Sequence, residues 1–353
     1  MSKLQLRRTW FQLHKWIGLA LAALIIPLSL SGALLVWDQP LDRLINPARY
    51  AVSGGDTLPP HAYVAAAQHV LAADEHIASL AYPGGRGPVI VQASIVGTKQ
   101  RAGPPARRSV WLDPPTARVL AVADSRSGVL RVIHRLHGSL MVPGVGRTLV
   151  GWIGVAMMLS CLTGLWLWWP IVGKWTRGLR WRRHSNLDTN LHHLMGFWIA
   201  LPLFILSLTG AWIALPALFA GRHQARPPAR TGGEPIAAPR TSPDTVLAEA
   251  RGAGKAATIF WPSVGTDPIW MIVAGKRTVT LSDRDGTMHV APTRPHGGIG
   301  ITGTMRRIHD GDGMGPAWQV LIFVAGIMPA ALAVTGIIMW WRARSWRAAA
   351  RKR

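Results

Sequence analysis

Two histidines, His137 and His309, precede the same two motifs at the same spacing. Each lies 27 positions before the glycine of a Thr-Gly pair and 31 positions before the first residue of a Trp-Trp pair. This ungapped match indicates an internal duplication that repeats a histidine at one edge of an apolar helix. Because neutral imidazole is a common metal ligand, the duplicated histidines predict paired axial ligands. The repeated motifs are Thr163-Gly164 with Trp168-Trp169 and Thr335-Gly336 with Trp340-Trp341.

A second pair of histidines, His14 and His192, keeps its own repeated spacing. Each follows a leucine, precedes one glycine by four positions and precedes another glycine by 18 positions. In both halves the later glycine follows a hydroxyl residue, as Ser31-Gly32 and Thr209-Gly210. The sequence therefore predicts two ligand pairs, with one member of each pair in each half of the chain.

Four long apolar runs determine the fold class. Each is close to or longer than the roughly 20 residues that a helix needs to cross a bilayer. Tryptophans gather near the ends of the runs, where an amphipathic ring favours the headgroup region. We therefore expect an integral membrane α-helical protein with a bundle of four transmembrane helices. The runs are Trp10 to Trp37, Gly146 to Trp169, Leu191 to Phe219 and Ala317 to Trp341.

The net charge of +23 is concentrated in short segments beside these runs. Basic residues flank the first run, fill the loop between the second and third, and follow the fourth. The positive-inside rule then places both termini in the cytoplasm and in contact with lipid headgroups. This distribution argues against nucleic acid as a partner. The first run has no small-residue cleavage site and carries His14, so we expect it to be retained as a signal anchor.

The two remaining segments are expected to lie outside the membrane and to form small α+β modules. In the first, residues 61–73 have helical spacing, and strands are expected at 89–91, 110–112 and 119–122. In the second, a helix is expected over 243–251 after Ser242, with strands at 269–273 and 278–281 and a turn at 283–286. Neither segment contains a phosphate-binding loop, a cysteine array or a nucleophile elbow.

This topology puts the histidines at two levels of the bundle. His14 and His192 form an inner pair at the cytoplasmic side, and His137 and His309 form an outer pair at the exterior side. A polar ring near the apolar region is costly unless it is paired or ligated, which favours a functional role. The alternative is an interfacial histidine that caps a helix or meets lipid headgroups. With Cys161 as the only cysteine and no C-x-x-C-H motif, any haem must bind non-covalently.

Each ligand pair is expected to have two glycines at its own depth, since a helix rises about 1.5 Å per residue. Gly32 and Gly210 should lie at the level of the outer pair, and Gly164 and Gly336 at the level of the inner pair. Missing side chains there could admit a flat macrocycle. Close helix packing through small residues is the alternative reading.

Breaks in the helical pattern separate the outer histidines from the long apolar runs. Pro143, Gly144 and Gly146 follow His137, and the segment 310–316 follows His309. We therefore expect both outer histidines on short segments folded over the exterior mouth of the bundle.

Other residues near the predicted ligands rank lower. The other copy of the repeat has an arginine at the position of His134 and a lysine at the position of His193. These two histidines are therefore second choices as ligands. Arg135 and Arg307 are repeated, and their guanidinium groups could hold haem propionates or an anionic substrate, or meet lipid. Met305 and Met314 are possible axial alternatives. A solvated surface position is expected for His61, His69, His76, His184, His223, His289 and His296.

These motifs resemble the PepSY-associated transmembrane family, and within it the inner-membrane ferric-siderophore reductases. The resemblance is carried by Leu13-His14-Lys15-Trp16-Ile17-Gly18, by His137 ahead of its Thr-Gly and Trp-Trp pairs, and by Leu191-His192 through Gly196. The stretch 110–114 resembles a PepSY strand and turn, although Thr116-Ala117 departs from the Thr-Gly often found there. The chain also has no flavin or nicotinamide domain, which leaves the electron donor open.

The resemblance implies two b-type haems in a bacterial inner membrane that carry electrons outward to a ferric siderophore. His14 and His192 would ligate one iron, and His137 and His309 the other. The donor would be an unidentified cytoplasmic reductase or a quinol. Alternatives are a di-haem oxidoreductase for another acceptor or quinone, and a non-enzymatic membrane protein whose PepSY-like modules bind a peptide or protease. A transporter subunit is disfavoured, because the spans have no acidic residues for ion coupling.

The expected organisation assigns every part of the chain. It comprises 1–37 as the N-terminus and first span, 38–131 as the first PepSY-like module, 132–169 as a histidine segment and the second span, 170–190 as a cytoplasmic loop, 191–219 as the third span, 220–307 as the second module, 308–341 as a histidine segment and the fourth span, and 342–353 as a cytoplasmic tail.

Overall fold

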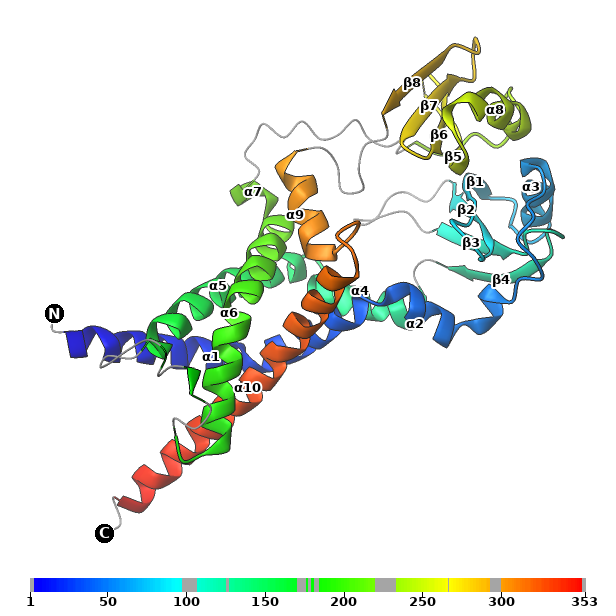
Figure 1. Cartoon of the computed structure of the whole chain (residues 1–353). Helices are drawn as coiled ribbons and strands as arrows, with labels where there is room; N and C mark the ends of the chain where they lie inside the picture. Colours follow the sequence, from blue (N-terminus) through cyan, green and yellow to red (C-terminus); the bar gives the residue numbers. More distant parts are fainter. Residues whose placement is uncertain are drawn as a thin grey trace. The chain divides into compact units, whose positions relative to one another are not determined.

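The structure is a computed structural model of the chain, in which two compact units are distinguished (Figure 1). The first unit comprises Met1–Asp38, Val132–Gln224 and His296–Arg353, and the second comprises Gln39–Arg131 and Ala225–Pro295. The structure describes residues 3–96, 107–124, 127–169, 176, 179–180, 184–219, 233–265, 267–292 and 300–350. His223 and His296 lie outside these described residues.

Four long helices form the first unit, and each is long and apolar enough to cross a membrane. α5 packs along α6, α1 packs along α10, and α6 also contacts α10. Prolines occur inside three of these helices, at Pro27, Pro202 and Pro329. The predicted membrane-helical class is therefore confirmed, with bounds α1 Lys3–Leu35, α5 Gly146–Trp168, α6 Leu187–Ala214 and α10 Pro316–Ala350.

Two short helices, α4 (Val129–Ser139) and α9 (Ile301–Asp310), carry the outer histidines and are separate from α5 and α10, as the breaks in the sequence predicted. The chain leaves α4 through two residues with positive φ, Leu140 at 49° and Met141 at 61°. Gly146 allows the chain to turn back past the end of α4 and begin α5, because a side chain at this position would lie 2.1 Å from the carbonyl oxygen of Ser139. The predicted boundaries at 132 and 308 fall inside α4 and α9. The first unit also contains the short helix α7 Pro216–Phe219, and α2 Asp38–Ile45 begins at its last residue before the second unit.

The second unit is built on one eight-stranded antiparallel sheet with strand order β4-β3-β2-β1-β5-β6-β7-β8. Each segment contributes a four-stranded meander, and the two meanders join where β1 pairs with β5, with Ser79 opposite Phe260. The sequence predicted two modules and did not predict this shared sheet. The strands are β1 Glu75–Ala81, β2 Val89–Ile95, β3 Arg107–Leu112, β4 Val119–Asp124, β5 Ala256–Phe260, β6 Ile269–Ala274, β7 Arg277–Ser282 and β8 Met288–Pro292.

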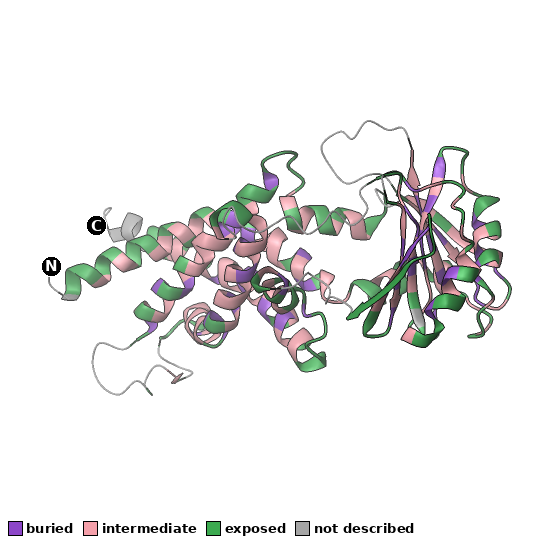
Figure 2. Cartoon of the chain, turned by 90° about the horizontal axis from the view of Figure 1, so that it is seen from above, coloured by how far each residue is buried: buried purple, intermediate pink, exposed green. Residues whose placement is uncertain are grey.

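Two helices, α3 (Pro60–Gln68) and α8 (Pro243–Glu249), pack against the sheet and close its core. Tyr63 and Val246 are fully buried there, and the strands supply most of the other buried residues (Figure 2). Ser242 caps α8 by accepting a hydrogen bond from the backbone of Thr245, as the sequence predicted. The helix expected over 61–73 is shorter. The unit also contains the short helices η1 Pro47–Tyr50 and η3 Ala250–Ala253.

Two buried aspartates, at corresponding positions in the two meanders, anchor neighbouring segments of the chain by hydrogen bonds. Asp113 follows β3 and accepts hydrogen bonds from the backbone and hydroxyl of Ser53 and from Thr116. Asp283 follows β7 and accepts from the backbone of Arg240 and Thr241 and from the indole of Trp270. Each carboxylate thus fixes the segment that leads into the helix of its half.

Candidate functional site

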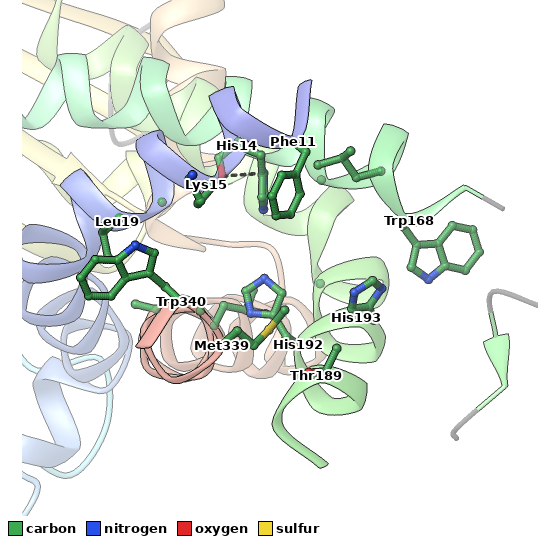
Figure 3. A pocket seen from close by; sticks show the side chains of 18 of the residues that line it. Phe11, His14, Lys15, Leu19, Trp168, Thr189, His192, His193, Met339 and Trp340 are labelled. Atoms are coloured by element: carbon green, nitrogen blue, oxygen red, sulfur yellow. Dashed lines mark hydrogen bonds between the residues drawn. The ribbon is translucent and has the colours of Figure 1, made fainter. Parts of the chain in front are cut away.

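The inner pair, His14 on α1 and His192 on α6, brings two imidazoles from different halves of the chain together. Their ring centroids lie 6.5 Å apart, and their planes are inclined by 81°. Figure 3 shows the two rings pointing toward one another across the same space. The sequence predicted this pair from spacing alone, although 178 residues separate its members.

A cavity of about 1430 Å³ surrounds the inner pair and is lined by all four long helices. Its size exceeds the roughly 300–1,000 Å³ typical of small-ligand pockets. Gly18 and Gly196 lie one helical turn beyond the two histidines and line the cavity. A Cβ atom at Gly18 would meet nothing within 4 Å, and one at Gly196 would meet only Leu332, at 3.9 Å. Side chains at these positions would fill space beside the imidazoles.

The outer pair, His137 on α4 and His309 on α9, repeats the arrangement near the other end of the long helices. The ring centroids lie 6.1 Å apart, and the planes are inclined by 30°. Two indoles hold α9 in place. Trp212 on α6 donates to Thr302, and Trp318 on α10 donates to the carbonyl of Ile308.

Both separations fit one metal ion held between two imidazoles. The two imidazoles of each pair could hold such an ion through Nε2. Among the described residues, no group of three or more histidine, cysteine or acidic side chains could hold a metal ion. A pair of neutral imidazoles suits an iron whose other ligands come from a macrocycle. The residues present therefore fit haem.

The hydrogen bonds of the inner pair fix the tautomer that ligation requires. Nδ1 of His14 lies 3.0 Å from Thr163 Oγ1. That hydroxyl donates its hydrogen to the carbonyl of Leu159 or Ser160 within its own helix, so it accepts from the imidazole. Nδ1 of His192 is paired in the same way with Thr335 Oγ1, at 2.9 Å. In both rings Nε2 is then unprotonated and could ligate a metal.

Backbone carbonyls fix the same tautomer in the outer pair. Nδ1 of His137 donates to the carbonyl of Leu28 at 2.9 Å, and Nδ1 of His309 lies 3.2 Å from the carbonyl of Leu206. His309 also lies 3.0 Å from Thr209 Oγ1. A carbonyl oxygen can only accept, so Nδ1 carries the proton in both rings.

The electrostatics of the outer pair favour neutral imidazoles. Burial lowers the pKa of His137, against the opposing effect of its bond to Leu28. Burial, followed by the neighbouring His137, lowers the pKa of His309 to about 4. Both rings are therefore unprotonated at Nε2 near neutral pH and can ligate a metal.

The four predicted glycines lie at the predicted levels, but each one faces an imidazole. A Cβ atom would lie 2.6 Å from Cε1 of His137 at Gly32, and 3.1 Å from Cε1 of His14 at Gly164. The corresponding distances are 3.0 Å to His309 at Gly210 and 3.5 Å to His192 at Gly336. These glycines make room for the imidazole rings that they face, and Gly164 and Gly336 also line the cavity around the inner pair.

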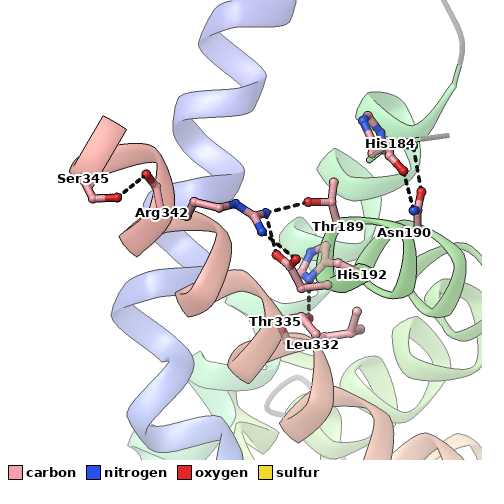
Figure 4. A network of polar contacts seen from close by, with 9 residues as sticks. His184, Thr189, Asn190, His192, Leu332, Thr335, Arg342 and Ser345 are labelled. Carbon is pink, nitrogen blue, oxygen red and sulfur yellow. Dashed lines mark hydrogen bonds and ion pairs between the residues drawn. The ribbon is translucent and has the colours of Figure 1, made fainter. Parts of the chain in front are cut away.

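An ion pair between α6 and α10 lies beside the inner pair. The guanidinium of Arg342 on α10 makes two bonds to the carboxylate of Asp188 on α6, at 2.8 and 2.7 Å, and a third to Thr189 (Figure 4). This bidentate geometry is among the stronger kinds of ion pair. It joins the two helices that carry His192 and its partner Thr335.

The lower-ranked residues lie outside the two ring pairs. His134 is exposed on α4, and the ring of His193 lies 4.9 Å from that of His184. Arg135 and Arg307 are exposed beside the outer pair, where their guanidinium groups can reach an anion. Among the histidines predicted to be solvated, His61 is exposed and lies 3.0 Å from Asp244, whereas His76 is partly buried and bonds the carbonyl of Pro235.

Sequence reasoning missed several residues of the site. Thr163, Thr335 and Thr209 stood out only as neighbours of glycines, whereas their hydroxyls bond the imidazoles. Their repeated position before the glycine was the available signal. The carbonyls of Leu28 and Leu206 had no signal, because every residue carries a backbone carbonyl.

Comparison with known proteins agrees with this architecture. An uncharacterized protein of Pseudomonas aeruginosa is 38% identical over 92 residues, which is 25% of this chain and 23% of that protein. The chain thus matches less than a quarter of that relative's length. The profile of the PepSY-associated TM region family matches residues 11–343, a range that includes both histidine pairs, all of α5 and α6 and most of α1 and α10. The chain therefore belongs to the PepSY-associated TM region family.

Proposed function

We propose that the chain is a transmembrane electron-transfer protein that binds two b-type haems and reduces a ferric siderophore. The observation that carries this proposal is the repeated pair of facing imidazoles, 6.5 and 6.1 Å apart, in which Nδ1 is hydrogen-bonded and Nε2 is available. A haem held by each pair would supply a one-electron ferric/ferrous couple. The sequence has no covalent attachment motif, so binding would be non-covalent.

The depth of the two pairs supports transfer across a bilayer. Gly32 packs against His137 and follows His14 by 18 residues on the same helix. That length of helix spans about 27 Å, close to the roughly 30 Å of a bilayer's hydrocarbon core. The charge pattern supports a cytoplasmic side for both termini and the inner pair, in a bacterial inner membrane.

The outer pair is the proposed side of substrate reduction. Arg135 and Arg307 are exposed beside it and could orient an anionic chelate or a haem propionate by bidentate bonds. One electron converts the bound ferric ion to the ferrous ion. Hard oxygen donors hold the ferrous ion less strongly, so iron is released. The electron would come from a cytoplasmic reductase or from a quinol.

Internal duplication accounts for the order of elements in the two halves. Each half runs from a long helix through a helix and four strands to a short histidine-bearing helix and a second long helix. Asp113 and Asp283 support the same reading, because each follows the third strand of its half and anchors the segment before α3 or α8. We propose that each half of the sheet unit is a PepSY-like module.

The direct test uses purified protein in detergent, reduced chemically and freed of reductant. Mixing with a ferric hydroxamate or catecholate in the presence of a chromophoric ferrous chelator should oxidise the protein and colour the chelator in equal amounts. A coloured protein that reduces a quinone but no ferric chelate would favour the alternative acceptor. A colourless protein that retains a peptide would favour the non-enzymatic alternative.

A further inference from the structure

The acceptors for Nδ1 differ between the two ligand pairs. In the inner pair the short bonds go to side-chain hydroxyls, those of Thr163 and Thr335, at 3.0 and 2.9 Å. In the outer pair His137 bonds the carbonyl of Leu28, and Nδ1 of His309 lies 3.0 Å from Thr209 Oγ1 and 3.2 Å from the carbonyl of Leu206. Threonine hydroxyls therefore bond both imidazoles at the inner level, but only one of the two imidazoles at the outer level.

The two threonines are buried and held in one orientation. Thr163 is 2% exposed and Thr335 is 9% exposed, and each hydroxyl lies 2.9 Å from the carbonyl four residues earlier in its helix. Donation to that carbonyl polarises the hydroxyl and makes it a better acceptor for the imidazole. The result is a chain of two hydrogen bonds from the helix backbone to each inner ligand.

We propose that Thr163 and Thr335 are positioning residues that set the reduction potential of the inner haem. This inference rests on the proposed function, because it requires haem between His14 and His192. A hydrogen bond from Nδ1 to an acceptor raises the basicity of the ligating Nε2. A more basic ligand stabilises ferric iron relative to ferrous iron. The two hydroxyls therefore hold the inner potential below the value that the same pair would give without them.

Removal of the two hydroxyls should shift the reduction potential of the inner haem and leave that of the outer haem unchanged. The carbonyls of Ser160 and Leu332 also face the inner rings, so the tautomer survives and the bond weakens. In the double variant Thr163→Val/Thr335→Val, we expect the preference for ferric iron to fall about tenfold. That change corresponds to an upward shift of about 59 mV for a one-electron couple. Valine keeps the volume of threonine, so both haems should remain bound.

Two further variants separate the hydrogen bond from other effects. Thr163→Ser/Thr335→Ser keeps both hydroxyls and should restore the original inner potential. Ser31→Ala removes an outer-level hydroxyl that bonds backbone carbonyls, whereas the hydroxyl of Thr209 at that level lies 3.0 Å from Nδ1 of His309 and is kept. Ser31 donates to the carbonyls of Pro27 and Leu28, and His137 bonds Leu28 directly. The outer potential should therefore stay unchanged in Ser31→Ala.

The experiment is a potentiometric titration of the full chain in detergent, followed at the absorption band of reduced haem. His14→Ala, which removes the inner ligand, identifies the component that belongs to the inner site. An upward shift of that component in the valine variant, reversed by serine, supports the inference. An unchanged inner potential with both haems present overturns the inference and leaves the proposed function intact. Absence of haem from the unaltered protein overturns both.

Discussion

A methyl group on Gly32 would lie 2.6 Å from Cε1 of His137, closer than a Cβ atom ordinarily approaches another heavy atom. The same substitution at Gly336 would place the methyl 3.5 Å from Cε1 of His192, an ordinary van der Waals contact. Gly32 and Gly336 thus occupy equivalent places beside a ligand ring, but only Gly32 has no room for a side chain. The two positions form a matched pair for testing what holds the imidazoles.

Gly32→Ala should displace His137 and weaken the outer haem by about 10–100-fold, the range seen when the support of a metal ligand is lost. Gly336→Ala should leave both haems bound. Haem-to-protein ratios of the two purified variants, measured after dialysis, check this expectation. Equal ratios in the two variants would show that the glycines do not hold the ligand rings.

The ligand pairs should be separable by substitution. His14→Ala should remove the inner haem and His137→Ala the outer one, so each variant should retain one haem per chain. His193→Ala and His134→Ala are the controls, since neither ring belongs to the inner or the outer pair. Absorption spectra with quantified haem provide the measurement. Loss of both haems from His14→Ala would contradict two independent levels.

The two sites should differ in their ferric electron paramagnetic resonance spectra. The imidazole planes are inclined by 81° in the inner pair and by 30° in the outer pair. This angle sets the splitting of the iron orbitals that interact with the rings, so two distinct low-spin signals are expected. His14→Ala should abolish one and retain the other. A single signal that accounts for both irons would be inconsistent with this geometry.

Asp113 should be a main support of the sheet unit. Its carboxylate is 1% exposed and accepts three hydrogen bonds, at 2.7, 2.6 and 2.6 Å. Asp113→Ala should therefore lower the free energy of unfolding by about 3 kcal/mol. Asp56→Ala is the control, because Asp56 is exposed in the same unit. Thermal unfolding of the full chain in detergent, followed by near-ultraviolet circular dichroism, provides the comparison.

The same carboxylates predict how the sheet unit responds to acid. Burial tends to raise the pKa of Asp113, but the bonds from Ser53 and Thr116 outweigh it and the pKa is lowered. The pKa of Asp283 is lowered likewise, because the hydrogen bonds from Arg240, Thr241 and Trp270 outweigh the effect of burial. A lowered carboxyl pKa stabilises the fold above the unfolded value of about 3.9. That stability should be lost as pH falls from about 4 through the folded values. Unchanged acid sensitivity in Asp113→Ala would count against this assignment.

The sequence predicted the four long helices and the pairing of the four histidines, for a physical reason. A bilayer imposes a minimum length of apolar helix, and the repeated spacing placed each histidine relative to a helix end. The breaks after His137 and before α10 likewise predicted the short helices α4 and α9. Each of these features depends on local sequence.

Several features that depend on distant contacts were not predicted. The strands β1, β5 and β8 were missed, and the pairing of β1 with β5 joins segments about 180 residues apart. Gly32 was predicted at the correct depth, but its role required the position of His137 on another helix. The bond from His137 to Leu28 uses a backbone carbonyl, which no residue type reveals.

The most direct test of the account is a reduced-minus-oxidised visible spectrum of the purified full chain, with haem and protein quantified in the same sample. Two facing histidine pairs predict b-type bands and two haems per chain. A ratio near one would show that only one pair binds haem. A colourless protein, expressed with adequate haem supply and still without haem bands after reconstitution, would contradict the proposed function.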